Sequence, residues 1–142
     1  EKFPDCNIFL FDDPGKRVDP NILFDKRIVS LVGTLSGAPL IKLIQEVDYL
    51  ICPDSYSKYL RNWVKGKQTI LCSKVAETPD EVIINACLGH YNRKTHGGRL
   101  LFNPVVKILG ATYNYNLTEF HFVDSINDIT PEEILDSIEV EK

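Results

Sequence analysis

A turn rich in glycine and hydroxyl side chains holds the residues whose types and spacing best suit chemistry. In "SLVGTLSGAPLIKLI" (30–44), an apolar run is followed by Gly33, Thr34, Ser36 and Gly37, and apolar residues then return at helical spacing. Backbone N–H groups at the start of a helix, flanked by hydroxyls, favour a bound anion such as phosphate. The same residue types are common wherever a strand passes into a helix. The turn therefore predicts either a phosphate site or a simple connection.

A second loop could complete this site. Ser55, Ser57 and Lys58 stand at the start of the next expected helix, directly after an expected strand. In open α/β sheets, ligands bind at the carboxyl ends of the strands, where the two loops would meet. A lysine ammonium acts on phosphate as a point charge. The sequence thus predicts a phosphate-binding set made of Gly33, Thr34, Ser36 and Lys58.

Motifs of known nucleotide sites and enzymes are missing from the sequence. "GTLSG" (33–37) is neither a GxGxxG fingerprint nor a P-loop ending in GK[ST]. His90, His96 and His121 lack a metal-ligand spacing such as HExxH, and no G-x-S-x-G element is present. We therefore expect no catalytic residue, no metal ligand and no cofactor, which favours a non-enzymatic role.

Three polar features remain as weaker candidates. His96 lies beside two glycines and could act as a loop catalyst, although a solvated histidine is the simpler interpretation. Asp12 and Asp13 end an expected strand and could bind a divalent cation or only open a turn. The basic loop at 92–99 could contact an anionic partner or simply be solvated.

Composition sets the limits on class and partners. The 142 residues fit one domain spanning 1–142, and the absence of methionine indicates a fragment of a longer or processed protein. A net charge of −4 argues against nucleic acid as a direct ligand, and no apolar run has the length of a membrane span. Four cysteines without CxxC spacing predict free thiols and an intracellular protein, nuclear or cytoplasmic.

The elements that must position these residues alternate along the chain. Strands alternating with helices predict a three-layer α/β fold, with helices on both faces of a mostly parallel sheet of four or five strands. In the helix at 55–66, the inner face is expected to consist of Tyr56, Tyr59, Leu60, Trp63 and Val64. The expected strands are 6–13, 27–33, 48–54, 68–75 and 119–124, and the expected helices are 38–47, 55–66, 78–91, 103–110 and 130–140.

Part of this pattern resembles a BRCT domain. The run "VDYLICPDSYSKYLRNWVKGKQTILCS" (47–73) is similar to the middle of that family, and "RIVSLVGTLSGAPLIKLI" (27–44) is similar to its first strand and helix. The sequence departs from the family in three places: the segment before the third strand is short, "KVAETPDEV" stands where the characteristic tryptophan is expected, and an expected strand precedes the supposed first one. The resemblance, over about residues 27–75, implies a phosphopeptide-binding role for Gly33 or Thr34, Ser36 and Lys58.

Three functions follow as alternatives. The first is a protein–protein interaction module, which recognises its partner either with or without a phosphorylated residue. The second is a Rossmann-like enzyme or ligand-binding domain acting on a phosphorylated small molecule at the same strand ends. The third is a purely structural domain of a larger assembly. The missing catalytic motifs favour the first and third.

Overall fold

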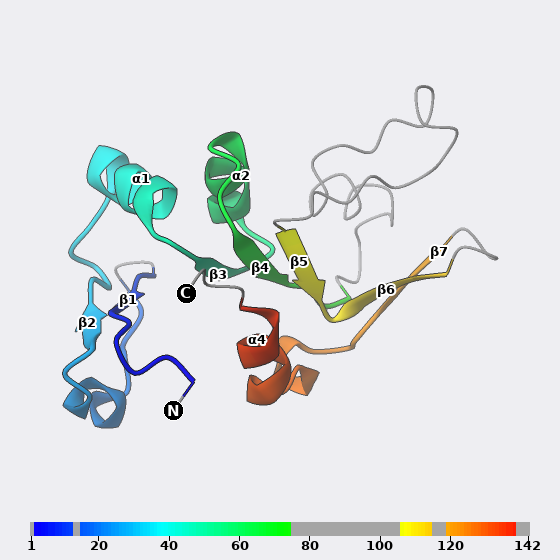
Figure 1. Ribbon diagram of the computed structural model, residues 1–142, viewed down its shortest axis with the longest axis horizontal. Coiled ribbons are helices and arrows are strands. Elements are labelled where there is room, and N and C mark those ends of the chain that lie inside the picture. Colours follow the sequence, from blue (N-terminus) through cyan, green and yellow to red (C-terminus); the bar gives the residue numbers. More distant parts are fainter. Residues whose placement is uncertain (1, 13–14, 75–105, 115–118, 139–142) are drawn as a thin grey trace. The chain divides into compact units, whose positions relative to one another are not determined.

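The computed structural model describes residues 2–12, 15–74, 106–114 and 119–138. The chain forms two compact units, Glu1–Leu43 and Ile44–Lys142. Both contain parallel strands together with helical segments (Figure 1), so the chain is broadly α/β, as the alternating pattern predicts. The boundary between the units falls within helix α1 (Gly37–Glu46).

The first unit is built on a two-stranded parallel sheet. Strand β1 (Ile8–Leu10) pairs with β2 (Ile28–Ser30), and Ile8 lies opposite Ile28. The 3₁₀ helix η1 (Pro20–Phe24) lies between the two strands in the chain. It begins at Pro20 because proline has the φ of a first helical turn, and because the preceding Asp19 carboxylate accepts the N–H of Asn21.

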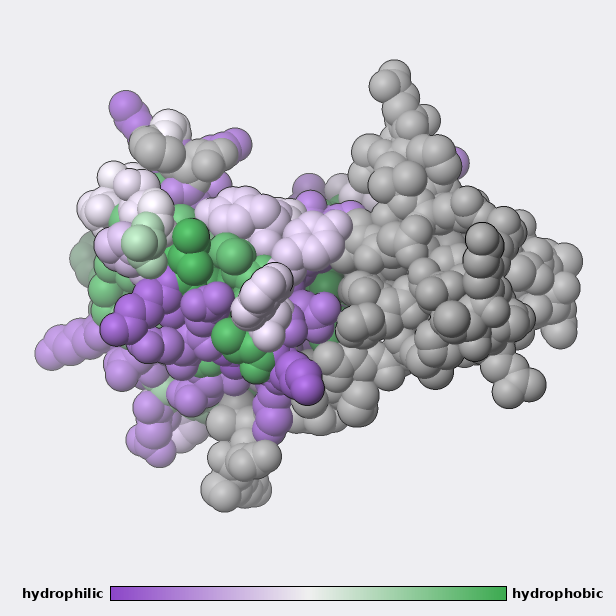
Figure 2. All heavy atoms as spheres, turned by 90° about the horizontal axis from the view of Figure 1, so that it is seen from above, coloured by the Kyte–Doolittle hydropathy of each residue, from purple (hydrophilic) through white to green (hydrophobic). Residues whose placement is uncertain are grey.

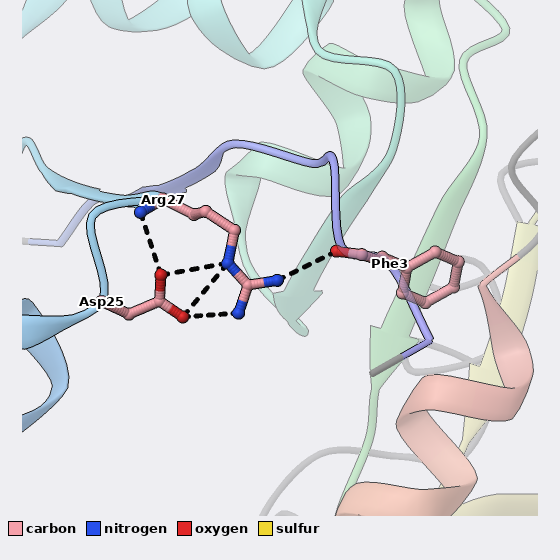
Figure 3. Close-up of polar contacts among 3 residues, drawn as sticks. All are labelled: Phe3, Asp25 and Arg27. Atoms are coloured by element: carbon pink, nitrogen blue, oxygen red, sulfur yellow. Dashed lines mark hydrogen bonds and ion pairs between the residues drawn. The ribbon is translucent and has the colours of Figure 1, made fainter.

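An ion pair fixes the return from η1 to β2. Asp25 accepts hydrogen bonds from Nε and Nη2 of Arg27 at 3.0 and 2.5 Å, and Arg27 also donates to the carbonyl of Phe3 (Figure 3). The hydrogen bonds from Arg27 lower the pKa of Asp25 to about 2. The guanidinium therefore connects the N-terminal segment to the turn before β2.

The second unit contains a three-stranded parallel sheet in the order β3–β4–β5. Its strands are β3 (Leu50–Pro53), β4 (Gln68–Leu71) and β5 (Val106–Leu109). Helix α2 (Tyr56–Trp63) joins β3 to β4, as parallel neighbours need a crossover connection. The first three residues of β4, the middle strand, are buried, as expected for a strand covered on both faces.

A hairpin and a C-terminal helix follow the sheet. Strand β6 (Ala111–Asn114) pairs antiparallel with β7 (Glu119–Phe122). The chain bends between β5 and β6 at Gly110, whose φ is 78° and whose absent side chain leaves room for the carbonyl oxygen of Cys72. The 3₁₀ helix η2 (Ile126–Asp128) and helix α4 (Pro131–Ser137) then each begin at a capping box.

Hydroxyl groups attach the end of α4 to the start of β4. The Tyr49 hydroxyl lies 2.8 Å from Oγ1 of the buried Thr69 and donates to the Ser137 carbonyl. Thr69 Oγ1 also lies 2.6 Å from Ser137 Oγ. The apolar core of the described residues consists of Ile44, Leu50, Cys52, Ile70, Cys72 and Ile129.

Two expectations about the elements differ from the structure. The prediction of a helix at 103–110 is wrong, because Val106–Leu109 form strand β5. Val106 and Ile108 are β-branched, and pairing with the buried β4 outweighs the local helical spacing. Within the described ranges the largest sheet has three strands rather than four or five. The helix expected at 78–91 lies outside the described residues. The helix expected at 38–47 forms one residue earlier, as α1, and the other expected elements form over shorter ranges.

Candidate interaction surface on helix α2

Helix α2 faces the sheet with polar side chains. Its buried residues are Ser57, Lys58 and Arg61, which share one side because residues three and four apart lie on the same helix face. Gln68 of β4 is also buried and donates from Nε2 to the Lys58 carbonyl at 3.2 Å. Its Oε1 has no hydrogen-bond partner among the described residues. Polar contacts therefore hold α2 against the sheet.

Lys58 is the most deeply buried charge of the helix. Only 2% of the residue is exposed, and its ammonium donates to the carboxylate of Asp54, four residues earlier. The Lys58 Nζ also lies 4.8 Å from the centroid of the Tyr59 ring, within cation–π range. Because Asp54 directly follows β3, this ion pair joins the end of that strand to the first turn of α2.

Arg61 holds the second turn of α2. Its guanidinium donates to the carbonyl oxygens of Gln45 at 2.6 Å, Asp48 at 3.0 Å and Lys67 at 3.2 Å. Burial lowers the pKa of Arg61, and the negative charge of Asp48 opposes that shift. Gly66 gives this side chain its space, since a Cβ at position 66 would lie 2.1 Å from Arg61 Nε.

The outer side of α2 carries three exposed aromatic residues, Tyr56, Tyr59 and Trp63, which we call the aromatic face. Their exposed fractions are 57%, 50% and 86%. Their spacing of three and four residues places them in one stripe along the helix. Figure 2 shows pale side chains, of intermediate hydropathy, over α2. The prediction that Trp63 packs into the core is wrong.

The partners available to its polar residues explain how α2 is oriented. Buried charges are tolerated where they are paired and hydrogen-bonded. Asp54 receives the Lys58 ammonium, and three carbonyl oxygens receive the Arg61 guanidinium. Because these two cations occupy the side of α2 that faces the sheet, the aromatic face lies on the side that faces water.

Positive charge accompanies the aromatic face. The segment 55–67 contains the basic residues Lys58, Arg61, Lys65 and Lys67 and no acidic residue. Lys58 and Arg61 are buried, whereas Lys65, just beyond the end of α2, is exposed. The charge that this segment presents to water is therefore positive.

The predicted phosphate-binding residues occur in both units. Gly33, Thr34 and Ser36 lie in the turn before α1, and Gly33 has a φ of 70°. The Thr34 hydroxyl donates to the Leu31 carbonyl at 3.0 Å, a contact within the turn itself. Lys58 belongs to the second unit, with its ammonium on Asp54. Binding of one anion by all four residues stays a prediction.

The other candidate residues show no assembled centre in the described part of the chain. No group of three or more His, Cys, Asp or Glu residues that could hold a metal ion is found there. Cys6, Cys52 and Cys72 form no disulfide, and His121 is exposed on β7. Among the helices that can be described, none is long and apolar enough to span a bilayer. His90, His96, Cys87, Asp13 and the basic loop at 92–99 lie outside the described residues.

Comparisons with protein-family models, with curated proteins and with solved structures give no match. The similarity of residues 27–75 to a BRCT domain therefore stays a prediction from motifs.

Apolar periodicity alone does not find the aromatic face. The signal that could have found it is the pair Asp54 and Lys58, because an acid four residues before a lysine can pair with it and so offers that lysine a buried position.

Proposed function

We propose that this protein is a protein–protein interaction module in which a segment of a partner protein binds the aromatic face of α2. The observation that carries the proposal is the 86% exposure of Trp63, the one tryptophan of the chain. Tyr59 and Tyr56 extend the same exposed stripe toward the start of the helix. Contiguous exposed rings of this kind mark interaction sites on folded proteins.

The energetics of interfaces support this choice. Tryptophan and tyrosine are enriched among the few residues that contribute most of the binding free energy. Each supplies a large contact area with only two rotatable side-chain bonds, so little entropy is lost on binding. The Asp54–Lys58 pair and the carbonyl contacts of Arg61 fix the backbone beneath the rings before a partner arrives. Such preorganisation reduces the cost of association.

We propose further that the partner carries a phosphorylated residue, bound at the turn that contains Gly33, Thr34 and Ser36. Support comes from the two hydroxyls of the turn, which is bounded by glycines with positive φ. Lys58 is left out of the proposed site, because only 2% of the residue is exposed and its ammonium donates to Asp54. The double variant T34V/S36A should weaken a phosphorylated peptide and leave its unmodified form unchanged in calorimetry; equal effects on both would remove this part of the proposal.

The proposal also includes the cellular location of the module and its complete fold. We place it inside the cell, nuclear or cytoplasmic, in keeping with the absence of a disulfide at Cys6, Cys52 and Cys72. We also propose a BRCT-type, three-layer arrangement of helices around a mostly parallel sheet of four or five strands, supported by the parallel pairing of β3, β4 and β5.

A peptide-display selection tests the central part of the proposal. Random peptides are selected on the immobilised wild-type protein, and each recovered peptide is then titrated against Trp63→Ala. Because hot-spot residues contribute about 2 kcal/mol or more, we expect about 30-fold weaker binding to this variant. Phe24→Ala is the matched control, since Phe24 is 84% exposed but belongs to the first unit. Recovered peptides that bind both variants as tightly as wild type would overturn the proposal.

A further inference from the structure

The end of helix α2 contains a lysine in a backbone conformation that favours glycine. Lys65 has a φ of 54°, and it is the one non-glycine residue with positive φ in the described chain. Its N–H donates to the Asn62 carbonyl at 2.9 Å, and the next N–H, of Gly66, donates to Arg61 at 3.1 Å. A left-handed residue that ends a helix in this way is usually glycine or asparagine. A lysine there costs stability.

The neighbouring glycine does not have this conformation, since Gly66 is not among the residues with positive φ. A Cβ at position 66 would meet the Arg61 side chain, which would have to shift. Position 65 has no such restriction, since Lys65 is exposed. A glycine at 65 would satisfy the same turn without strain. Lys65 thus stands where glycine would cost less, and residues in unfavourable backbone conformations often cluster at binding sites.

The charges of the residues near Lys65 agree with a role for this lysine in binding. Lys65 follows Trp63 by two residues and lies at the end of the aromatic face. No acidic residue occurs in the segment 55–67, so nothing within this segment offers Lys65 a carboxylate. A binding surface that combines aromatic rings with an exposed ammonium complements a segment that combines apolar and acidic side chains.

We infer that the occupant of the aromatic face is an acidic segment of a partner protein, with an apolar side chain on Trp63 and a carboxylate on Lys65. This inference rests on the proposed function and adds the chemistry of the partner to it. Aromatic rings beside lysines could also stack on single-stranded nucleic acid. The net charge of −4 favours the acidic protein segment, because it repels a polyanion as a whole whereas a short segment feels mainly the local positive charge.

The peptides recovered by display provide the first test. We expect those that depend on Trp63 to combine aromatic or leucine residues with a net negative charge, and their affinity to fall as the salt concentration rises. If Trp63-dependent peptides are neutral or basic, the acidic partner is wrong while the interaction module stands. If no peptide depends on Trp63, both conclusions fall. Binding of oligothymidylate that quenches Trp63 more strongly than the acidic peptides do would assign the face to nucleic acid instead.

Variants of Lys65 provide the second test and separate binding from folding. Lys65→Gly and Lys65→Asn both accept the left-handed conformation without the charge, so we expect an unchanged or higher melting temperature together with roughly two- to five-fold weaker binding of the acidic peptides. Lys65→Glu should weaken them at least about ten-fold, and Lys65→Arg should retain binding. Unchanged affinity in the glycine, asparagine and glutamate variants would overturn the inference.

Discussion

Lys58 and Trp63 have exchanged the environments that their side chains usually occupy, since the lysine is 2% exposed and the tryptophan 86%. The two residues belong to the same short helix, α2, which buries cations against the sheet and leaves its rings in water. Lysine is almost never fully buried unless it is paired, and Asp54 supplies the pairing here. This inversion is the basis of the interaction module proposed above.

The Asp54–Lys58 pair should respond unequally to loss of each partner. Asp54→Ala leaves the buried ammonium without its carboxylate and should lower the free energy of unfolding by about 3 kcal/mol. Lys58→Met removes the charge, keeps most of the side-chain volume and leaves Asp54, which is partly exposed, to be solvated, so the loss should be within about 1 kcal/mol. Urea titration of both variants measures the difference. A larger loss for Lys58→Met would contradict the account of this pair.

Arg61 should be difficult to replace even by lysine. Its planar guanidinium reaches three carbonyl oxygens at once, which a compact ammonium cannot do. We expect both Arg61→Lys and Arg61→Leu to lower the free energy of unfolding by more than about 2 kcal/mol, because the carbonyl groups of Gln45, Asp48 and Lys67 lose the guanidinium as a donor. Asn62→Ala is the neighbouring control for loss of a polar side chain on the same helix. Full rescue by lysine in a urea titration would show that only the charge of Arg61 matters.

The sequence predicts much of the order of helices and strands, because that order depends on local signals. Thr130, Pro131 and Glu133 form the expected start of α4, and the apolar runs around Leu50 and Ile70 form the expected parallel strands. The strand β5 is not predicted, because the run from Val106 to Leu109 fits a helix by spacing and becomes a strand only through its pairing with β4.

The candidate site is less predictable for a similar reason. In α2, two sets of residues have helical spacing, the aromatic set and the set containing Lys58 and Arg61. Which set is buried depends on a carboxylate and on carbonyl oxygens contributed by Gln45, Asp48 and Lys67, outside the helix. Hydropathy ranks the aromatic set as the core, and only the tertiary contacts reverse that order.

Three glycines form a graded test of the backbone. Gly110→Ala should lower the free energy of unfolding by more than about 3 kcal/mol, because a Cβ would lie 2.1 Å from the Cys72 carbonyl oxygen and φ is 78°. Gly37→Ala meets no atom within 4 Å but has a φ of 60°, so about 1 kcal/mol is expected. Gly15→Ala has open space and no positive φ, and should stay within about 0.5 kcal/mol. Any other ranking by chemical denaturation would contradict the described backbone.

The Asp25–Arg27 pair predicts a stability change in acid. Arg27 lowers the pKa of Asp25 from its ordinary 3.8 to about 2. A group with a lower pKa in the folded state stabilises the fold at a pH above its unfolded pKa, and this stabilisation is lost as the pH falls through the folded value. For Asp25 that window runs from about pH 4 down to about pH 2.

Titration of the Asp25 carboxyl carbon by NMR measures this shift directly. The wild type should titrate with a midpoint near 2. In Arg27→Leu the midpoint should rise but stay below 3.8, because the backbone N–H at position 27 still donates to the carboxylate. A wild-type midpoint at the ordinary value would show that the ion pair does not form in solution.

The exposure of Trp63 is the central claim, and quenching of its fluorescence tests that claim most directly. The chain has one tryptophan, so the emission comes from Trp63 alone. With acrylamide as a neutral quencher, we expect nearly the same quenching constant in the native protein as in the urea-unfolded chain, and Trp63→Ala should change the free energy of unfolding by no more than about 0.5 kcal/mol. A native quenching constant several-fold below the unfolded value, together with a loss of about 3 kcal/mol or more in Trp63→Ala, would place the indole in the core and contradict the aromatic face.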